Sequence, residues 1–237
     1  MKFKVNWYER LPSTNSFLKE LAELKGQLPT GTVVAAREQT SGRGRMEREW
    51  LSGANENLTF SLLISDKIEM RKWPSATMAA AVAVAEMLEK EGINASLKWP
   101  NDVLVNGRKI CGILAERIAQ GLIIGIGLNV NMQAADHIDQ PATSVLIETG
   151  KRASVDDLLS NLLKHLSIRL DEWAQGGFSK VRKNWEAKVP NIGKTVTVRD
   201  GGAVLTGILT GFGENGELLL REKGGIVRAV WAGDVSA

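Results

Sequence analysis

The spacing of apolar residues predicts strands and helices along the first 190 residues. Short apolar or alternating runs predict strands, at Lys2–Glu9, Thr32–Arg37, Leu58–Ile64, Ser96–Trp99, Val103–Val105, Lys109–Glu116 and Gly121–Asn131. Apolar residues at helical spacing predict helices, at Ser16–Leu24, from near Pro74 to about Lys90, from a Ser154 cap through Leu170, and at Phe178–Lys188. Asn106-Gly107 is a two-residue hairpin signal, so the strand after it should fold back on the strand before it.

The pattern changes after Asn191. Short β-rich runs separated by Gly-containing turns follow, at Thr195–Arg199, Ala203–Thr210, Glu217–Arg221 and Ile226–Trp231. Strands at this spacing predict a small barrel of roughly 45 residues. We therefore expect an α+β domain over residues 1–189, with helices packed on a mixed β-sheet, and a small β domain over residues 190–237.

Composition fits a folded protein with a sizeable core. The 237 residues are 43% hydrophobic and 24% charged, with a formal net charge of +3, which excludes a disordered or collagen-like chain. This net charge is too small to imply nucleic-acid binding by itself. The lone Cys111 cannot form an internal disulfide, and we find no export signal and no apolar run long enough for a membrane span. These features predict a cytoplasmic protein that does not associate with membranes.

Several familiar signatures are weak in this chain. Gly211-Phe-Gly-Glu-Asn-Gly216 has the spacing of a dinucleotide-binding loop, but a predicted strand rather than a helix follows it, so we interpret the glycines as hairpin turns. His137 and His165 have no partner at metal-ligand spacing. Cys111 lies within an apolar strand and is interpreted as a small core residue. No metal-ligand set and no cysteine, histidine or serine nucleophile is predicted.

The segment Gln39–Trp50 is rich in glycine and arginine and is predicted to be a loop. Arg43 and Arg45 would offer two forked donors on a backbone that glycines allow to approach a ligand closely. Three interpretations remain open from this segment alone: a polyanion-binding loop that closes over its ligand, a solvated basic loop, or an RNA contact.

Two further segments carry candidate chemistry. Lys98-Trp-Pro-Asn-Asp102 is followed by Lys109 on the return strand of the predicted hairpin, so both lysines can face one cleft. Gly125–Asn131 places glycines inside an apolar strand, which marks either close approach by a ligand or a bulged core strand.

Together these segments resemble the biotin protein ligases. The similarity rests on order and spacing across residues 13–131, through Ser13-Thr14-Asn15, Gln39, Gly42-Arg43-Gly44-Arg45, Trp50, Lys98–Asp102, Lys109, Gly112 and Gly125–Asn131. The resemblance implies a mixed-sheet catalytic domain of the class II synthetase-like type with a C-terminal SH3-like barrel. It also implies the activity: biotin and ATP form biotinyl-5′-AMP and pyrophosphate, and an acceptor lysine then takes the biotin.

The resemblance also implies roles for individual residues. Biotin would contact Ser13, Thr14, Asn15, Gln39, Gly42, Arg43, Gly44, Arg45, Lys98, Gly112, Gly125 and Gly127. ATP would contact Arg43, Arg45, Trp50, Asn101, Lys109, Asn129 and Asn131. Lys98, Arg45 and Lys109 are the expected catalytic residues. Mg²⁺ would offset phosphate charge, with Asn129 or Asn131 near it.

The expected acceptor is the biotin carboxyl carrier protein domain of acetyl-CoA carboxylase or a related biotin-dependent carboxylase. An edge strand can serve acceptor docking or homodimerisation. Regulatory family members carry a DNA-binding winged helix, and the 12 residues before Ser13 are too few for one, so DNA binding is not expected. The chain departs from the family at Met46-Glu47, where many members have a glycine. Two alternative functions stay open: a lipoate or octanoate protein ligase of related fold, and a non-catalytic nucleic-acid-binding module.

Overall fold

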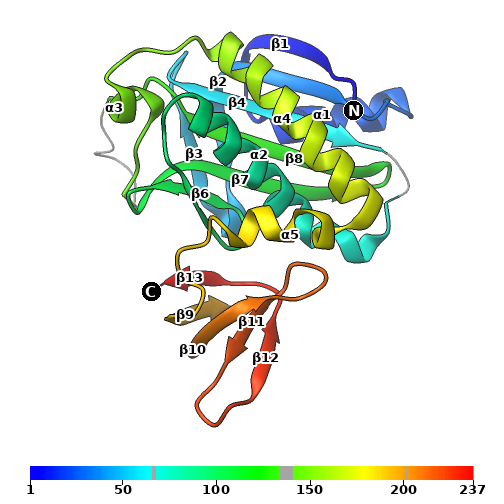
Figure 1. The fold of residues 1–237 in the computed structure, drawn as a ribbon. Helices are drawn as coiled ribbons and strands as arrows, with labels where there is room; N and C mark the ends of the chain where they lie inside the picture. The colour runs from blue at the N-terminus through cyan, green and yellow to red at the C-terminus, as the bar shows by residue number, and fades with distance from the viewer. Residues whose placement is uncertain (66–67, 134–140, 201, 237) are drawn as a thin grey trace.

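A computed structural model describes residues 1–65, 68–133, 141–200 and 202–236 (Figure 1). His137 lies outside the described residues. The N-terminal strands are β1 Lys4–Leu11, β2 Thr32–Arg43, β3 Glu49–Ser52, β4 Asn57–Ile64, β5 Ser96–Lys98, β6 Asp102–Val105, β7 Arg108–Ile118 and β8 Gly121–Asn129. The helices are α1 Thr14–Lys25, α2 Ala76–Lys90, α3 Val145–Thr149, α4 Val155–Gly176 and α5 Phe178–Glu186, with 3₁₀ turns η1 Arg45–Glu47 and η2 Met70–Ser75.

The N-terminal strands form one mixed sheet in the order β1-β2-β4-β8-β7-β6-β5, with β3 paired to β2. β1 and β2 are parallel, and the other pairs are antiparallel. The predicted Asn106-Gly107 hairpin joins β6 to β7, and both residues have positive φ, as such a turn requires. The mixed sheet predicted from the sequence is confirmed.

The two faces of this sheet carry different layers (Figure 1). Helices α2, α4 and α5 cover one face and share its core with Ile124, Ile126 and Leu128 of β8. Helix α1 covers part of the other face, where Leu18 packs against a smaller cluster from β2, β4 and β8. Because side chains alternate along a strand, Gly125, Gly127 and Asn129 must point to the α1 face.

Residues after Asn191 form a second, antiparallel sheet of β9 Thr195–Asp200, β10 Ala203–Phe212, β11 Leu218–Arg221, β12 Val227–Val230 and β13 Asp234–Ser236. Its order is β12-β11-β10-β9-β13. This C-terminal sheet packs on α5, because the Phe212 ring meets the rings of Phe178 and Trp185 edge-on, with centroids 6.2 Å and 5.8 Å away. The separate C-terminal β unit expected from the sequence is confirmed.

Gly213 and Gly216 of the dinucleotide-like motif lie in the hairpin turn between β10 and β11, as predicted, whereas Gly211 lies within β10 at a register shift. Gly216 packs so closely on α2 that an added Cβ would lie 2.6 Å from Met78 Sδ. Its carbonyl accepts a 2.9 Å hydrogen bond from Trp99 Nε1. The turn therefore joins the C-terminal sheet to the Trp-Pro turn of the N-terminal sheet.

The prediction of one long loop over Gln39–Trp50 is wrong. β2 continues to Arg43, and β3 returns along it with Gly42 opposite Trp50. Gly42 makes this pairing possible, because a Cβ there would lie 2.3 Å from the Trp50 carbonyl oxygen. Only the short turn from Gly44 to Arg48, which contains η1, is not strand.

Smaller differences concern boundaries and short elements. Pro74 lies in η2, just before α2, rather than inside the first turn of the helix. Ser154 caps α4 by accepting a hydrogen bond from the Asp157 N–H at 3.2 Å, as the capping signal predicts. The short elements α3 and β13 were not predicted.

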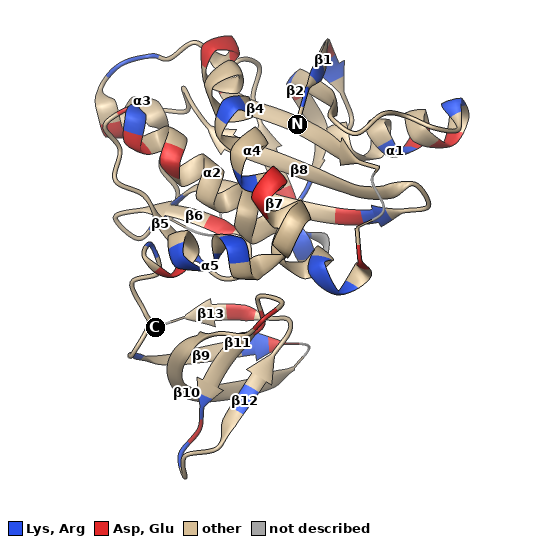
Figure 2. Ribbon diagram, turned by 45° about the vertical axis from the view of Figure 1, so that its right-hand side comes forward, with Lys and Arg blue, Asp and Glu red and all other residues tan. Residues whose placement is uncertain are grey.

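Within the described residues, no helix is long and apolar enough to span a membrane. Basic and acidic residues are interspersed over both sheets and their helices (Figure 2).

Candidate active site

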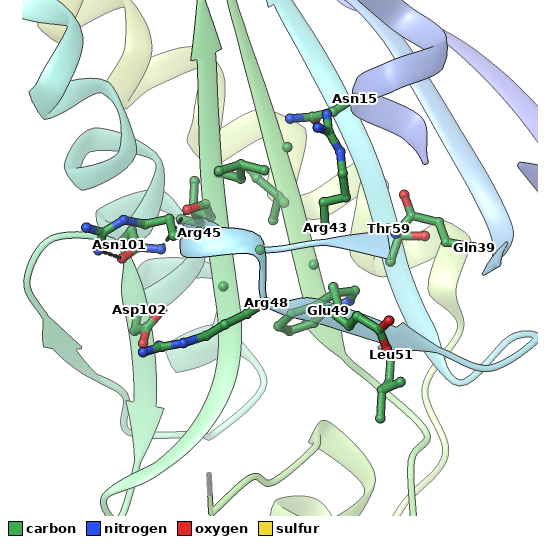
Figure 3. A pocket seen from close by; sticks show the side chains of 18 of the residues that line it. Asn15, Gln39, Arg43, Arg45, Arg48, Glu49, Leu51, Thr59, Asn101 and Asp102 are labelled. Atoms are coloured by element: carbon green, nitrogen blue, oxygen red, sulfur yellow. Dashed lines mark hydrogen bonds between the residues drawn. The ribbon is translucent and has the colours of Figure 1, made fainter. Parts of the chain in front are cut away.

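A cavity of about 450 Å³ opens on the α1 face of the N-terminal sheet, beneath the Gly44–Arg48 turn and β3 (Figure 3). Most of the residues singled out from the sequence line it, namely Ser13, Thr14, Asn15, Gln39, Arg43, Gly44, Arg45, Trp50, Asn101, Lys109, Gly112, Gly125, Gly127 and Asn129. Segments from residue 13 to residue 129 thus converge on one cavity.

Glycines form the floor. A Cβ on Gly125 would lie 2.3 Å from Asn15 Oδ1, and one on Gly127 would lie 2.4 Å from Trp50 Cε2. A Cβ on Gly112 would lie 3.0 Å from Lys109 Cε. Without side chains at these positions, polar and aromatic groups can lie directly on the sheet. The side chains of Asn15 and Trp50 make this close approach, and β8 pairs with β4 and β7 without a register shift, so the interpretation as a bulged core strand is wrong. Close approach by a ligand stays a prediction.

Neutral polar groups gather at the start of α1. Ser13 caps the helix, and its Oγ accepts from the Ser16 N–H at 3.4 Å. Gln39 Oε1 accepts from the Thr14 N–H at 2.8 Å and from its hydroxyl at 3.0 Å. The buried Ser61 hydroxyl donates to Asn15 Oδ1 at 2.5 Å, and Asn15 Nδ2 donates to Glu116 at 2.6 Å. These bonds fix the orientation of an uncharged donor and acceptor set at this end of the cavity.

Cationic groups line the other walls, and each one meets an acid. Arg43 pairs with Glu116 at 2.9 Å, and Lys109 pairs with Asp102 at 2.7 Å. Lys109 also lies 5.8 Å from the Trp50 ring centroid. Arg45 donates to Asn101 Oδ1 at 3.0 Å (Figure 3). Fixed cations around a partly enclosed cavity favour a polyanionic ligand, because charges interact more strongly away from bulk water.

Lys98 does not line the cavity, but it shares the cavity's face of the sheet. It pairs with Asp102 on β6, Asp102 pairs with Gly112, and Gly112 pairs with Gly127. Directly paired residues project to the same face. Lys98 is half-buried and makes no side-chain hydrogen bond or ion pair with another described residue, so its ammonium group is free to meet a ligand.

Two other expected residues have structural contacts instead. Gly42 pairs with Trp50 between β2 and β3, and its missing Cβ leaves space for the Trp50 carbonyl. Asn131 lies outside the cavity, where its Oδ1 accepts from the Ala153 N–H at 3.0 Å and its Nδ2 donates to two backbone carbonyls. Asn129 does line the cavity, but its Oδ1 accepts from Asn57 at 2.9 Å. Each asparagine oxygen therefore accepts one hydrogen bond from the protein, and a position near magnesium stays a prediction for both.

Sequence reasoning missed several contributors to the site. Glu116 and Ser61 hold Asn15 and Arg43, and Asp234 reaches the cavity from the C-terminal sheet. Glu116 is the fourth residue after Gly112 on β7, so strand alternation could have found it on the cavity face. Asp234 carries no comparable signal, because its contacts with Arg45 and Arg48 join segments 189 and 186 residues apart.

The described residues contain no group of three or more His, Cys, Asp or Glu side chains that could hold a metal ion. Cys111 faces away from the cavity into the core, where burial raises the pKa of its thiol far above the usual range. A thiol that stays protonated is a poor nucleophile. Cys111 is therefore not placed to act as a nucleophile in this cavity.

Comparison with known proteins places the chain in a family. The model of the biotin/lipoate A/B protein ligase family matches residues 7–132, and that of the biotin protein ligase C terminal domain matches residues 192–237. The bifunctional ligase/repressor BirA of Bacillus subtilis is 34% identical over 238 residues, which cover 97% of this chain and 72% of that protein. The biotin–(acetyl-CoA-carboxylase) ligase of Paracoccus denitrificans is 32% identical over 91% of this chain and 94% of its own length.

A solved structure agrees in fold over nearly the whole chain. Biotin protein ligase from Aquifex aeolicus in complex with biotin and ATP superposes with a TM-score of 0.87 at 32% identity, covering 98% of this chain and 97% of that one. The first family model spans more than half of this chain, and the second covers the C-terminal sheet. The chain therefore belongs to the biotin/lipoate A/B protein ligase family and, within it, to the biotin protein ligases.

Proposed function

We propose that this protein joins biotin to a lysine of a biotin carboxyl carrier domain in two steps. In the first, the biotin carboxylate attacks the α-phosphorus of ATP, the bond to the β-phosphate breaks, and biotinyl-5′-AMP and pyrophosphate form. In the second, the acceptor amine attacks the acyl carbon and AMP leaves. The observation that carries the proposal is a single glycine-floored cavity with neutral polar groups at one end and fixed cations on its other walls.

The neutral end suits the uncharged bicyclic ring of biotin, which has a urea oxygen and two N–H donors. Ser13, Thr14 and Gln39 supply hydroxyl and amide groups of matching kind, and Gly125 and Gly127 let Asn15 and Trp50 lie close to the sheet beside them. Ser61 and Glu116 hold Asn15 by hydrogen bonds, and Asn15 would help to shape the biotin end of the cavity through this fixed orientation.

The cationic walls suit the nucleotide. A carboxylate and an α-phosphate repel each other, and preorganised cations offset this repulsion as the two groups approach. Lys98 would neutralise the reacting charges, Lys109 and Arg43 would bind phosphates, and Arg45 would hold the adenylate. Trp50, Asn101 and Asn129 would contact the base and sugar.

Mg²⁺ would arrive as part of the nucleotide substrate. The oxygens of Asn129 and Asn131 each accept a hydrogen bond from the protein, and the carboxylates of Asp102 and Asp234 pair with cations. Mg²⁺ takes several of its ligands from phosphates and water in such sites. The protein's own contribution is then the cations that flank the phosphates.

Partners and compartment follow from the same proposal. The acceptor would be the carrier domain of acetyl-CoA carboxylase or a related carboxylase, in the cytoplasm. β1 and β5 end the strand order of the N-terminal sheet. The Leu97 N–H of β5 already donates to the Lys188 carbonyl at 2.8 Å, so β1 is the edge that can pair with an acceptor or a second copy of the chain. We take residues 1–189 as the catalytic domain and residues 190–237 as the C-terminal domain.

Two alternatives are less well supported. A lipoate or octanoate ligase would share the family of the N-terminal sheet, but the C-terminal match is to a biotin protein ligase domain. A nucleic-acid module is less well supported because the family models that match both parts of the chain are those of protein ligases.

The decisive experiment measures pyrophosphate release from Mg·ATP by the purified protein with biotin, with lipoate, and with neither. We expect release that depends on biotin alone. Release with lipoate instead would favour the related ligase. No release with either acid from folded protein would overturn the proposal, and salt-dependent RNA binding would then be the next measurement.

Gly125→Ala tests the biotin end of the cavity. The new methyl group would displace Asn15 and cost it hydrogen bonds to Ser61 and Glu116. We expect the KM for biotin to rise about tenfold, equivalent to roughly 1.4 kcal/mol of lost binding, while the KM for ATP stays unchanged. Equal changes in both constants, measured by pyrophosphate release, would contradict the assignment.

A further inference from the structure

We propose that Asp234, on the C-terminal sheet, is a positioning residue that holds the Gly44–Arg48 turn at the mouth of the cavity. Asp234 accepts a 2.5 Å hydrogen bond from Arg48 Nη2, and its other oxygen lies 3.8 Å from Arg45 Nη1. The neighbouring Gly233 carbonyl accepts from Arg45 at 3.5 Å. We call these contacts of Asp234 and Gly233 with Arg45 and Arg48 the clamp. Its role in the reaction rests on the proposed function, but the contacts themselves do not.

The pairing of Arg43 with Glu49 closes the turn at its base. Its internal bonds are Gly44 N–H to the Arg48 carbonyl at 2.7 Å and Arg48 N–H to the Arg45 carbonyl at 3.2 Å. Met46 at its tip is 54% exposed and has φ +54°, a left-handed conformation that side-chain-bearing residues disfavour. Beyond its paired base, the turn is tied to other parts of the protein through the side chains of Arg45 and Arg48.

The C-terminal sheet offers a firm anchor. Asp234 begins β13 and pairs with Arg199 of β9, and the next residue, Val235, is buried in the core. Gly233 approaches β9 so closely that an added Cβ would lie 2.7 Å from Val198 Cγ1. A carboxylate at this point is fixed by its strand rather than by a flexible loop.

Asp234 holds Arg48 more closely than Arg45, so the two arginines can have different roles. The Arg48 contact is short and direct, whereas Arg45 is 3.8 Å from Asp234 and also reaches Asn101. Arg48 can therefore stay on Asp234 and hold the turn while Arg45 moves onto a phosphate. The C-terminal sheet would in this way fix the position from which Arg45 moves onto the phosphate of the adenylate.

Limited trypsin digestion without biotin or ATP tests the clamp directly, because Arg45 and Arg48 are themselves cleavage sites. Asp234→Asn should speed cleavage after these two residues about fivefold, the size expected for loss of a partly exposed ion-pair network. Asp234→Glu should restore slow cleavage. Glu222→Gln, which removes a carboxylate paired with Arg228 inside the C-terminal sheet, should leave the rate unchanged.

Equal cleavage of wild type and Asp234→Asn would overturn the proposal, as would faster cleavage in Glu222→Gln. If Asp234→Asn is digested throughout because it misfolds, Arg48→Gln removes the same contact from the turn, and faster cleavage after Arg45 alone is then expected. In the full reaction, Asp234→Asn should raise adenylate leakage to bystander lysines severalfold. Slow wild-type cleavage in a protein that releases no pyrophosphate would leave the clamp standing and reject only the proposed function.

Discussion

Lys98→Ala is expected to lower the single-turnover rate of biotin adenylation by about 10²–10³-fold, as for loss of one preorganised charge stabiliser. Lys98 projects from the cavity face of the sheet and has no side-chain partner among the described residues. Its ammonium group can therefore meet the carboxylate and the α-phosphate where they repel each other most. Rapid-quench measurement of biotinyl-5′-AMP from labelled ATP gives the rate directly.

Lys90→Ala is the matched control, since this exposed lysine ends α2 away from the cavity. It should leave the adenylation rate unchanged. An unchanged rate in Lys98→Ala would remove Lys98 from the reaction. A rise in the KM for ATP with a normal single-turnover rate would instead make Lys98 a binding residue only.

Arg45→Gly is expected to release the adenylate into solution, with dissociation about 10- to 100-fold faster, the range for losing a hydrogen bond to a charged group. Arg45 reaches both Asn101 and the C-terminal sheet across the mouth of the cavity. Free biotinyl-5′-AMP acylates any accessible amine, so bystander protein such as serum albumin should become biotinylated. Streptavidin blotting of a mixed reaction reports this labelling.

Arg71→Gly serves as the control, because this exposed arginine pairs with the nearby Glu69 and does not line the cavity. It should label no more bystander protein than the wild type. If labelling by Arg45→Gly stays confined to a carrier-domain acceptor, Arg45 does not retain the intermediate.

Local signals were enough to predict most of the strands and helices. An apolar run predicted β8, Asn106-Gly107 predicted the β6–β7 hairpin, and Ser154 predicted the start of α4. The error over Gln39–Trp50 has a physical cause. Glycine normally favours loops, but Gly42 lies in a strand because the β3 backbone passes where a Cβ would be.

The site was partly predictable for a similar reason. Residues carried by local motifs, such as Gly42-Arg43-Gly44-Arg45 and Lys98–Asp102, could be recognised from their spacing, although Gly42 and Lys98 do not line the cavity. Asp234 could not, because only the packing of the C-terminal sheet brings it to Arg48. The hydrogen bonds that the oxygens of Asn129 and Asn131 accept could not be predicted from the sequence either, since their donors come close only in the folded chain.

The edge-on contacts of Phe212 with Phe178 and Trp185 have a thermodynamic consequence. They belong to one hydrophobic cluster that runs from α2 and α4 into β9, β10 and β11. Removing the C-terminal sheet would expose the buried rings of Phe178 and Trp185 to water. Exposing this aromatic surface alone would cost several kcal/mol of free energy. Calorimetry should therefore record a single heat-absorption peak for the whole chain, with no intermediate in which one part has melted and the other has not.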